Sequence, residues 1–378
     1  MDFTIKRIDL LAAIDKCAIA VPGDHQNSAF NVVRVEGKGK KKVKLSVVGE
    51  RAAVDTVVEA EVKEPGFFNV LPKRLRDIAA SMPDGKVQFS LKGTRVTVKS
   101  GAGSRRATFE SHLVDLFSVD DPGRDAPWIT VDAKELERAL RLIKPMAASR
   151  FSDALSVSLL IATERGLDVF GCNDHLIGLI ETSIRVDSKE TIQVPAQAAE
   201  VLFKMTDIDE NVRLLMTPSR VYLENCDTLV SAALPAKYTY ETTYPMFIGY
   251  LKGTDGNKRI AGPTFDPALM KSGVRSVLAL GGFANKDERD KGMNVHLHLG
   301  SDTVKIELAL GIADAKDEFG VVSSEGELTS VVDSGYLLSI LGSLDASTQV
   351  KAYHTHDDLM LVLQSQGIAV GLMKKVTT

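Results

Sequence analysis

The chain has 378 residues, of which 44% are hydrophobic and 25% charged, so it is long enough for about three domains with apolar cores. No apolar run approaches the roughly 20 residues that span a bilayer, and six charged residues interrupt the first 20 positions, so we expect a cytoplasmic protein without a signal peptide. The formal net charge of −4 excludes a surface that is basic throughout, and any nucleic-acid contact must come from local basic faces.

The first third of the chain predicts two strand-to-helix units and a strand pair. In the first unit a short strand leads into apolar residues at helical spacing, and in the second a proline opens the helix. Two strands with alternating apolar residues follow. The residues are Phe3–Ile5 with Leu10, Ala13 and Ile14, then Val70–Pro72 with Leu75 and Ile78, and finally Val87–Leu91 with Val96–Val98.

A lysine-rich turn interrupts this first third. Residues 37–42 read Gly-Lys-Gly-Lys-Lys-Lys between two strand-like runs, which predicts the tip of a β-hairpin. A solvated turn is the ordinary interpretation of such a segment. Contact with phosphate is the alternative, because lysines on a glycine-rich backbone can approach an anion closely.

The remaining two thirds repeat the same order of elements after two connections, Asp120–Pro127 and Gly249–Gly262. The repeated residues are Ile129–Asp132 with Leu136, Ala139 and Leu140; Val194–Pro195 with Ala198 and Val201; Val212–Met216 with Val221–Leu223; Pro263–Phe265 with Met270, Gly273 and Val274; Val332–Ser334 with Leu337 and Ile340; and Val350 with Leu359–Leu363. Two elements in one order, three times over, predict three similar α+β domains, each with two helices on antiparallel sheets. The expected boundaries are 1–122, 128–247 and 257–378.

Cations recur on the inferred helices. In the helix after Asp132, Arg138, Arg141 and Lys144 follow one another at spacings of three, on the face away from the apolar residues. The cations on the other helices are Lys73, Arg74, Arg76, Lys204, Lys271 and Arg275. An ordinary solvated face is the better interpretation of any one helix. Recurrence on equivalent helices favours a shared purpose.

No catalytic constellation rises above background. The chain lacks a phosphate-binding loop, a dinucleotide fingerprint and a serine-nucleophile elbow. Its three cysteines lie far apart without a Cys-x-x-Cys pair, which indicates reduced thiols. Two pairs, His296 with His298 and His354 with His356, could each place two imidazoles on one strand face. Exposed strand histidines are the simpler interpretation, so we expect neither an enzyme nor a cofactor.

Five segments in order along the chain carry a family resemblance. They are Met1–Ile5, Leu155–Val157, Phe170–Leu179, Tyr238–Glu241 ahead of Tyr244–Pro245, and the apolar strand at the C-terminus. Together with the threefold repeat, they resemble the bacterial DNA polymerase III beta subunit, the sliding clamp, over the whole length. The resemblance implies a head-to-tail dimer whose six domains form a ring around duplex DNA. Such a ring tethers the replicative polymerase for processive synthesis.

The resemblance also implies roles for three sets of residues. The cations that would face DNA are Lys73, Arg74, Arg76, Arg138, Arg141, Lys144, Arg150, Lys204, Lys271 and Arg275. A pocket for short peptides from polymerases and the clamp loader would be lined by Leu155, Cys172, Asp174, His175, Leu176, Ile177, Tyr238, Thr243, Val370 and Leu372. The dimer contact would join the edge strand that holds Ala107 and Phe109 to Val274, Val277 and Leu278 of the partner.

Two segments depart from the family's pattern. Asp174-His175-Leu176 stands where the family has Gly-His-Arg, and Met373–Val376 with two further threonines replaces its short Pro-Met-Arg-Leu tail. We therefore expect a peptide groove that is more apolar than those of its relatives. Two other functions stay open: a repeat scaffold that binds no DNA, and a metal-dependent hydrolase that uses the His-x-His strands.

Overall fold

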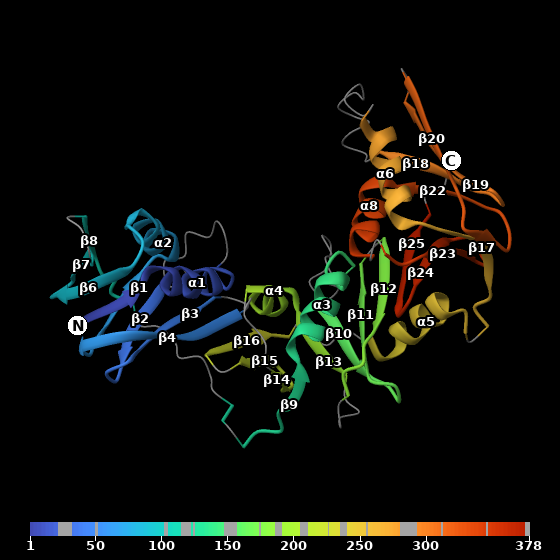
Figure 1. Cartoon of the computed structure of the whole chain (residues 1–378). Coiled ribbons are helices and arrows are strands. Elements are labelled where there is room, and N and C mark those ends of the chain that lie inside the picture. Colours follow the sequence, from blue (N-terminus) through green and yellow to red (C-terminus); the bar gives the residue numbers. More distant parts are fainter. Residues whose placement is uncertain are drawn as a thin grey trace. The chain divides into compact units, whose positions relative to one another are not determined.

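One strand, one helix and three antiparallel strands form a repeat that recurs along the chain (Figure 1). The computed structural model describes residues 1–21, 32–49, 52–101, 105–114, 122–123, 125–146, 157–173, 175–185, 191–204, 211–225, 227–234, 240–254, 256–279, 293–310, 313–344 and 347–374. Six such repeats lie within these ranges, two in each third of the sequence. This arrangement confirms the predicted α+β class.

The first third holds two repeats that exchange their first strands. The elements are β1 (Asp2–Lys6), α1 (Arg7–Ala18), β2 (Val33–Lys38), β3 (Lys42–Val48) and β4 (Ala52–Glu64), then β5 (Phe67–Val70), α2 (Pro72–Ser81), β6 (Lys86–Lys92), β7 (Arg95–Ser100) and β8 (Arg106–Glu110). Strand β1 pairs with β6 of the second repeat, and β5 pairs with β2 of the first. Neither repeat therefore completes its sheet alone.

The middle and last thirds follow the same plan. The middle elements are β9 (Ile129–Asp132), α3 (Ala133–Ile143), β10 (Val157–Ala162), β11 (Leu167–Cys172), β12 (Leu176–Glu181), β13 (Ile192–Pro195), α4 (Ala196–Lys204), β14 (Asn211–Met216), β15 (Arg220–Asn225) and β16 (Thr228–Ala233). The last are α5 (Tyr240–Lys252), β17 (Arg259–Phe265), α6 (Pro267–Leu278), β18 (Asn294–Leu299), β19 (Thr303–Leu310), β20 (Ala313–Gly320), β21 (Ser323–Ser324), β22 (Leu328–Asp333), α8 (Ser334–Ser343), β23 (Val350–Thr355), β24 (Met360–Ser365) and β25 (Ile368–Met373). The same exchange pairs β9 with β14, β17 with β23 and β22 with β18.

An aspartate at the end of the preceding strand starts several helices. The Asp132 carboxylate accepts a hydrogen bond from the Glu135 amide, Asp266 from the Ala268 amide, and Asp333 from the Gly335 amide. Each bond satisfies an amide that the first helical turn leaves without a partner. The apolar residues predicted for these helices are buried, as Leu136, Met270 and Leu337 show with no exposed side-chain area. No described helix is both long enough and apolar enough to cross a membrane.

The chain forms two compact units, residues 1–137, 186–188 and 192–235 in one, and residues 138–185, 189–191 and 236–378 in the other. In the first unit, β4 pairs with β16, and the buried hydroxyls of Thr56 and Thr228 lie 3.0 Å apart at this junction. In the second unit, β12 pairs with β25. Sheets thus continue across both predicted domain boundaries, and the three-domain division stays a prediction.

The first unit is built on one twelve-stranded sheet system, ordered β8-β7-β6-β1-β4-β16-β15-β14-β9 with β5-β2-β3 joined to β4. Aromatic rings fill its core: the centroids of Phe3 and Phe89 are 4.9 Å apart, and Phe68 lies 6.0 Å from Phe89. All three side chains are at most 1% exposed. Their stacked burial fixes β1, β5 and β6 to one another.

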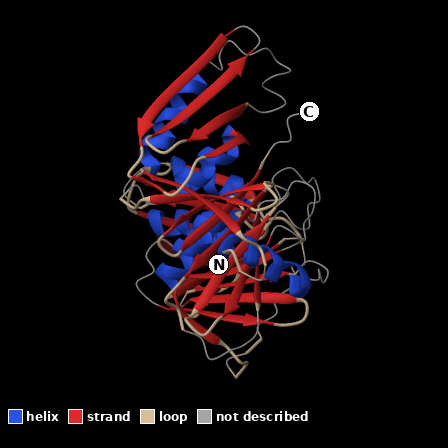
Figure 2. Ribbon diagram, turned by 90° about the vertical axis from the view of Figure 1, so that its right-hand side faces the viewer, coloured by secondary structure: helices blue, strands red, loops and turns tan. Residues whose placement is uncertain are grey.

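The second unit holds an eight-stranded run, β10-β11-β12-β25-β24-β23-β17-β21, and a four-stranded sheet, β20-β19-β18-β22. Helices α6 and α8 pack against each other and against the four-stranded sheet (Figure 1). Figure 2 shows helices lying beside strands along the molecule. Strands β12 and β25 are buried on both faces, which explains their nearly continuous apolar sequences. At Gly178 the end of α3 comes so close that an added Cβ would lie 2.7 Å from Ile143 Cδ1 and 3.0 Å from Met146 Cγ.

We expect Gly178→Val to lower the free energy of unfolding by about 1–3 kcal/mol, because the new side chain would overlap Ile143 and Met146 in a closed core. Urea denaturation followed by circular dichroism measures the change. Gly320→Val is the matched control, since no atom lies within 4 Å of its added Cβ. Equal stabilities of the two variants would contradict this account of the contact between α3 and β12.

Candidate functional site

The predicted cations occupy the exposed faces of their helices. On α2, Lys73, Arg74 and Arg76 are exposed while Leu75 and Ala79 are buried. The other described members of the set are Arg138 and Arg141 on α3, Lys144 just after it, and Lys271 and Arg275 on α6; all are exposed except the half-buried Lys271. Arg150 and the side chain of Lys204 lie outside the described residues. The exposed face recurs as the sequence predicted, and DNA contact stays a prediction.

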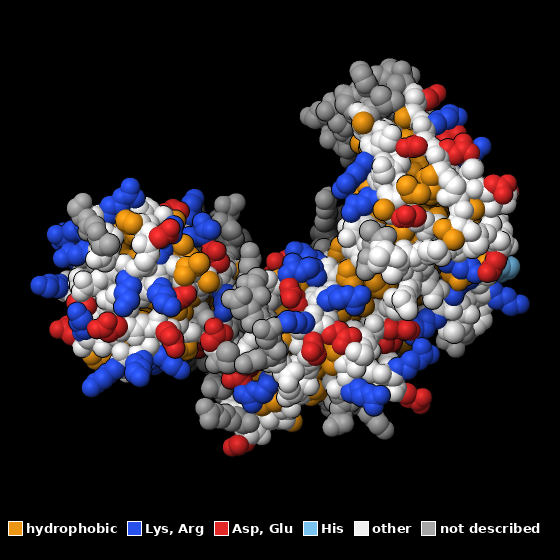
Figure 3. All heavy atoms as spheres, viewed as in Figure 1, with side chains coloured by type: hydrophobic (Ala, Val, Ile, Leu, Met, Phe, Trp, Pro, Cys, Tyr) orange, Lys and Arg blue, Asp and Glu red, His pale blue; other side chains and the backbone are white. Residues whose placement is uncertain are grey.

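Some of these cations have acidic neighbours. Asp15 accepts a hydrogen bond from Arg76 Nε at 2.7 Å, and this bond raises the pKa of the arginine. On the face shown in Figure 3, the Lys and Arg side chains of each unit are interspersed with Asp and Glu. Lys271 and Arg275 line an open pocket of about 360 Å³ between α6 and α8, together with Ser272 and Leu341. The charge pattern suits weak, non-specific contact with phosphates better than a deep anion site.

The peptide-pocket residues that the structure describes meet where β12 pairs with β25, but they lie on two faces of the sheet. Cys172 and Ile177 belong to an apolar cluster on the face covered by α5. Leu176, Val370 and Leu372 alternate with that cluster along their strands and point to the opposite face. The structure therefore places the predicted lining residues on two faces of the sheet, and the pocket stays a prediction. Gly371 and Met373 are the residues on the face of Ile177.

This α5-side surface, which we call the groove, contains an unusually close contact. A Cβ added to Gly371 would lie 3.1 Å from Met360 Cγ and 3.3 Å from Ile177 Cγ1, so Met360 occupies the space above the glycine. Met360 is 4% exposed, whereas Met373 beside it is 39% exposed. The backbone amide of Met373 donates to the carbonyl of His175, whose ring centroid is 4.9 Å from that of Tyr336. Leu155, Asp174, Tyr238 and the side chain of Thr243 lie outside the described residues.

Helix α5 is the part of the groove that the sequence did not indicate. Tyr244, Phe247 and Ile248 pack against the cluster, and Leu251 is fully buried within it. Pro245 and Gly249 within the helix are typical of loops, which is why the sequence predicted a connection here. The spacing of Tyr244, Phe247, Ile248 and Leu251 is helical, and it was the signal available.

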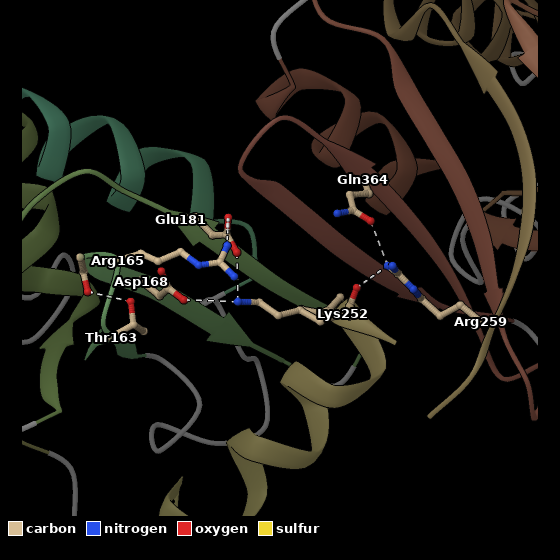
Figure 4. A network of polar contacts seen from close by, with 9 residues as sticks. Thr163, Arg165, Asp168, Glu181, Lys252, Arg259 and Gln364 are labelled. Carbon is tan, nitrogen blue, oxygen red and sulfur yellow. Dashed lines mark hydrogen bonds and ion pairs between the residues drawn. The ribbon is translucent and has the colours of Figure 1, made fainter. Parts of the chain in front are cut away.

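Polar contacts fasten the end of α5 to the sheet (Figure 4). Asp168 and Glu181 stand directly opposite each other on β11 and β12, and Lys252 Nζ lies 3.6 Å from the first carboxylate and 3.0 Å from the second. Burial raises the pKa of Asp168, and the Lys252 charge opposes that rise. Arg259 donates to the Leu251 carbonyl at the helix end and to Gln364 at 3.0 Å. These contacts hold the end of α5 against the sheet.

A second polar cluster fixes the end of β25. Lys374 Nζ lies 2.6 Å from an Asp358 carboxylate oxygen and 3.1 Å from the Thr329 carbonyl. His354 Nδ1 lies 3.0 Å from the same Asp358 oxygen. His354 is 5% exposed, and burial together with the Lys374 charge lowers its pKa to about 4. The expectation of an exposed histidine was wrong here, because the side chain belongs to the interior of the second unit.

The metal-site alternative gains no support from the described residues. His354 is buried and His356 exposed, so this pair does not present two imidazoles to one ligand. His298 Nε2 lies 3.7 Å from Glu307, which also binds Lys316. Within the described ranges no three His, Cys, Asp or Glu side chains gather as a metal site would require.

The residues predicted for the dimer contact are mostly interior. Phe109, Val274 and Val277 are at most 4% exposed within their own units, so their side chains are not free for a partner. Ala107 and Leu278 are half-buried. Strand β8 does lie at a sheet edge, as predicted, and β20 is the edge of the four-stranded sheet. Unpaired strand edges can bind another chain through their backbone groups.

Comparison with known proteins identifies the fold. Residues 1–116 match the family model described as the N-terminal domain of the DNA polymerase III beta subunit. Over 100% of both chains, the structure is similar to the beta subunit from Thermotoga maritima (14% identity, TM-score 0.83), the beta subunit from Pseudomonas aeruginosa (19%, 0.80) and the sliding clamp from Bacillus subtilis (15%, 0.81). No curated protein matches the chain. The comparisons confirm the family resemblance and the clamp fold.

The buried histidine makes stability depend on pH. In the unfolded chain His354 binds a proton below pH 6.5, whereas the folded protein resists protonation until about pH 4. The contribution of neutral His354 to the free energy of unfolding is therefore complete above pH 6.5. It is lost as the pH falls toward 4, and the total loss is about 3 kcal/mol. Urea denaturation between pH 7.5 and 4.5 measures this loss.

The controls for this prediction are two glutamine variants. We expect His354→Gln to flatten the pH dependence in this window, because glutamine carries no charge at any pH. His356→Gln, at the exposed neighbour, should leave it unchanged. Parallel curves for the parent and His354→Gln would contradict the assignment.

Proposed function

We propose that the protein is a DNA sliding clamp that encircles duplex DNA in the cytoplasm and tethers the replicative polymerase for processive synthesis. The likeness of the entire chain to beta-subunit structures is the observation that carries this proposal. The match of residues 1–116 to the family's N-terminal domain supports the proposal from sequence alone, independently of the fold. The protein acts by holding its partners together and catalyses no reaction.

The proposed ring holds DNA topologically, so individual contacts can be weak. Lysines and arginines on the exposed faces of α2, α3 and α6 supply such contacts to phosphates, without reading the bases. Weak and sequence-independent contact is what sliding requires. The overall charge of −4 limits binding of DNA to other surfaces.

The proposed dimer joins β8 of one chain to β20 of its partner, head to tail, so that two identical contacts close the ring. The side chains near the two edges carry opposite charge. Arg95, Lys99 and Arg106 are exposed on β7 and β8. On β20, Asp314 and Glu318 are exposed and Asp317 is half-exposed. This proposal keeps the predicted edge strand β8 and moves the partner's side of the contact from Val274 and Val277, whose side chains are interior, to the edge strand β20.

The clamp proposal predicts retention on closed DNA. The parent should have the native mass of a dimer and, once loaded onto a nicked circular plasmid, should stay bound in high salt and dissociate when the circle is cut. Reversal of Lys73, Arg138 and Lys271 to Glu should reduce loading several-fold and flatten its salt dependence, because each cation displaces phosphate counterions. Gel filtration of the complexes measures retention.

The control reverses three exposed cations that lie off the helices, Lys86, Lys92 and Lys258. If this control variant loads as poorly as the helix variant, overall charge and not the helix faces governs binding. A parent that is strictly monomeric at micromolar concentration, or that leaves circular and linear DNA equally fast, contradicts the clamp proposal. A dimer with no affinity for DNA would favour the scaffold alternative.

We further propose that polymerase and clamp-loader peptides bind in the groove between α5 and the ends of β12 and β25. Met373 supplies accessible surface, and Met360 covers Gly371 at its floor. A peptide anchor would enter by displacing the Met360 side chain, whose unbranched thioether adapts readily. Apolar anchors suit this groove, because the side chains on its face, among them Ile177, Met360 and Met373, are apolar.

The groove predicts a specific loss of peptide affinity. Met373→Glu should weaken binding of fluorescein-labelled pentapeptides with two apolar anchors at least ten-fold, because one buried anchor contributes about 1.5–3 kcal/mol. Fluorescence anisotropy measures the affinity. Leu269→Glu is the matched control, since Leu269 is 47% exposed on α6, away from the groove. Equal affinity of the Met373 variant and the parent would exclude this surface.

A further inference from the structure

The hairpin between β2 and β3 carries a lysine cluster that is separate from the cations on the helices. The strands pair in register from Val33 opposite Val47 to Lys38 opposite Lys42, and Gly39 turns the chain with a φ of +62°. The cluster consists of Lys38, Lys40, Lys41 and Lys42, all of them exposed. Like charges at directly opposite positions, as at Lys38 and Lys42, oppose strand pairing. An anion between them would relieve that repulsion.

The tip is held rigidly by its neighbours. The Ala60 amide donates to the Lys41 carbonyl at 2.8 Å, the Val62 amide donates to the Lys40 carbonyl at 3.0 Å, and the Gly37 amide donates to the Gly66 carbonyl at 3.0 Å. The lysine side chains therefore project from a fixed backbone. A charged ligand loses less binding free energy to ordering here than at a loop that must first be immobilised.

Carboxylates neutralise only part of the cluster. Lys38 Nζ lies 3.0 Å from Glu36, and Glu59 stands opposite Lys42 on β4. Among the described residues, Lys40 and Lys41 have no carboxylate within 4 Å. Glu61 is exposed on the same strand as Glu59, so the excess positive charge is concentrated at the turn itself.

We infer that this hairpin is a second DNA contact, in which Lys40 and Lys41 bind backbone phosphates of a duplex. Lysines are compact charges that bind phosphate without the fork geometry by which arginine reads guanine. Segments 36–44 and 59–66 contain no arginine and no aromatic residue on which an unpaired base could stack. Duplex DNA, bound without regard to sequence, is therefore the ligand that this chemistry favours. The inference rests on the proposed function only in requiring that the protein meets duplex DNA.

The test compares Lys40→Ala/Lys41→Ala with the matched control Lys92→Ala/Lys258→Ala, which removes two exposed lysines elsewhere. The probe is a fluorescein-labelled 30-base-pair duplex, titrated by anisotropy between 50 and 200 mM KCl. The hairpin variant should bind about ten-fold more weakly at 50 mM, and its slope of log affinity against log salt should be shallower by about two. The control should match the parent in both quantities.

Three other results would each contradict either the hairpin inference or the proposed function. If the hairpin variant binds the duplex as the parent does, with the same salt slope, the inference is overturned while the helix-face variant still tests the clamp. If the hairpin variant loses binding to poly-glutamate but keeps its duplex affinity, the hairpin serves an acidic protein and the DNA assignment is wrong. If the parent itself binds no duplex at any salt concentration, the proposed function is contradicted, and the hairpin inference, which requires duplex binding, is overturned with it. Circular dichroism of both variants checks that the hairpin remains folded.

Discussion

Antiparallel pairing between strands far apart in the sequence is the constraint on which this structure depends. Each third exchanges first strands between its two repeats, and each unit contains a pairing that crosses a predicted boundary, β4 with β16 or β12 with β25. Main-chain hydrogen bonds make these joints independent of side-chain identity. A chain that is 12–20% identical to these beta-subunit structures can therefore share their fold, provided the alternation of buried and exposed residues survives.

The same strand pairing determines which surfaces of the protein are free to vary in sequence. Because one side of each helix is committed to a sheet, its other side is free to carry charge, and α2 shows this division between Leu75 and its exposed cations. Among the described strands, β8 and β20 each pair on one side only, so each leaves an edge that can pair with another chain. The proposed weak contacts to DNA and the proposed pairing between chains would thus both follow from one pattern of burial.

Periodicity predicted the helices and most strands because burial on one face leaves a direct imprint on sequence. It could not assign the two faces of β25, where residues on both faces are apolar and alternation gives no signal. It missed α5, where tertiary packing of Leu251 and fastening by Lys252 override Pro245 and Gly249. It also could not distinguish an interface residue from a core residue at Val274, since both are apolar.

The groove shows how a local exchange of residue size could set partner choice. Gly371 provides room on β25 that Met360 of the neighbouring strand fills, so the closed floor is made by a flexible side chain instead of backbone. A flexible floor accepts anchors of different shape at small cost, whereas a β-branched residue at position 371 would fix one shape. Because α5 and Lys374 hold the two sides of this region, the adaptation is confined to Met360 and Met373. In the proposed peptide groove, specificity would therefore depend on side-chain packing over a rigid frame, and it could change without disturbing the strand pairing beneath.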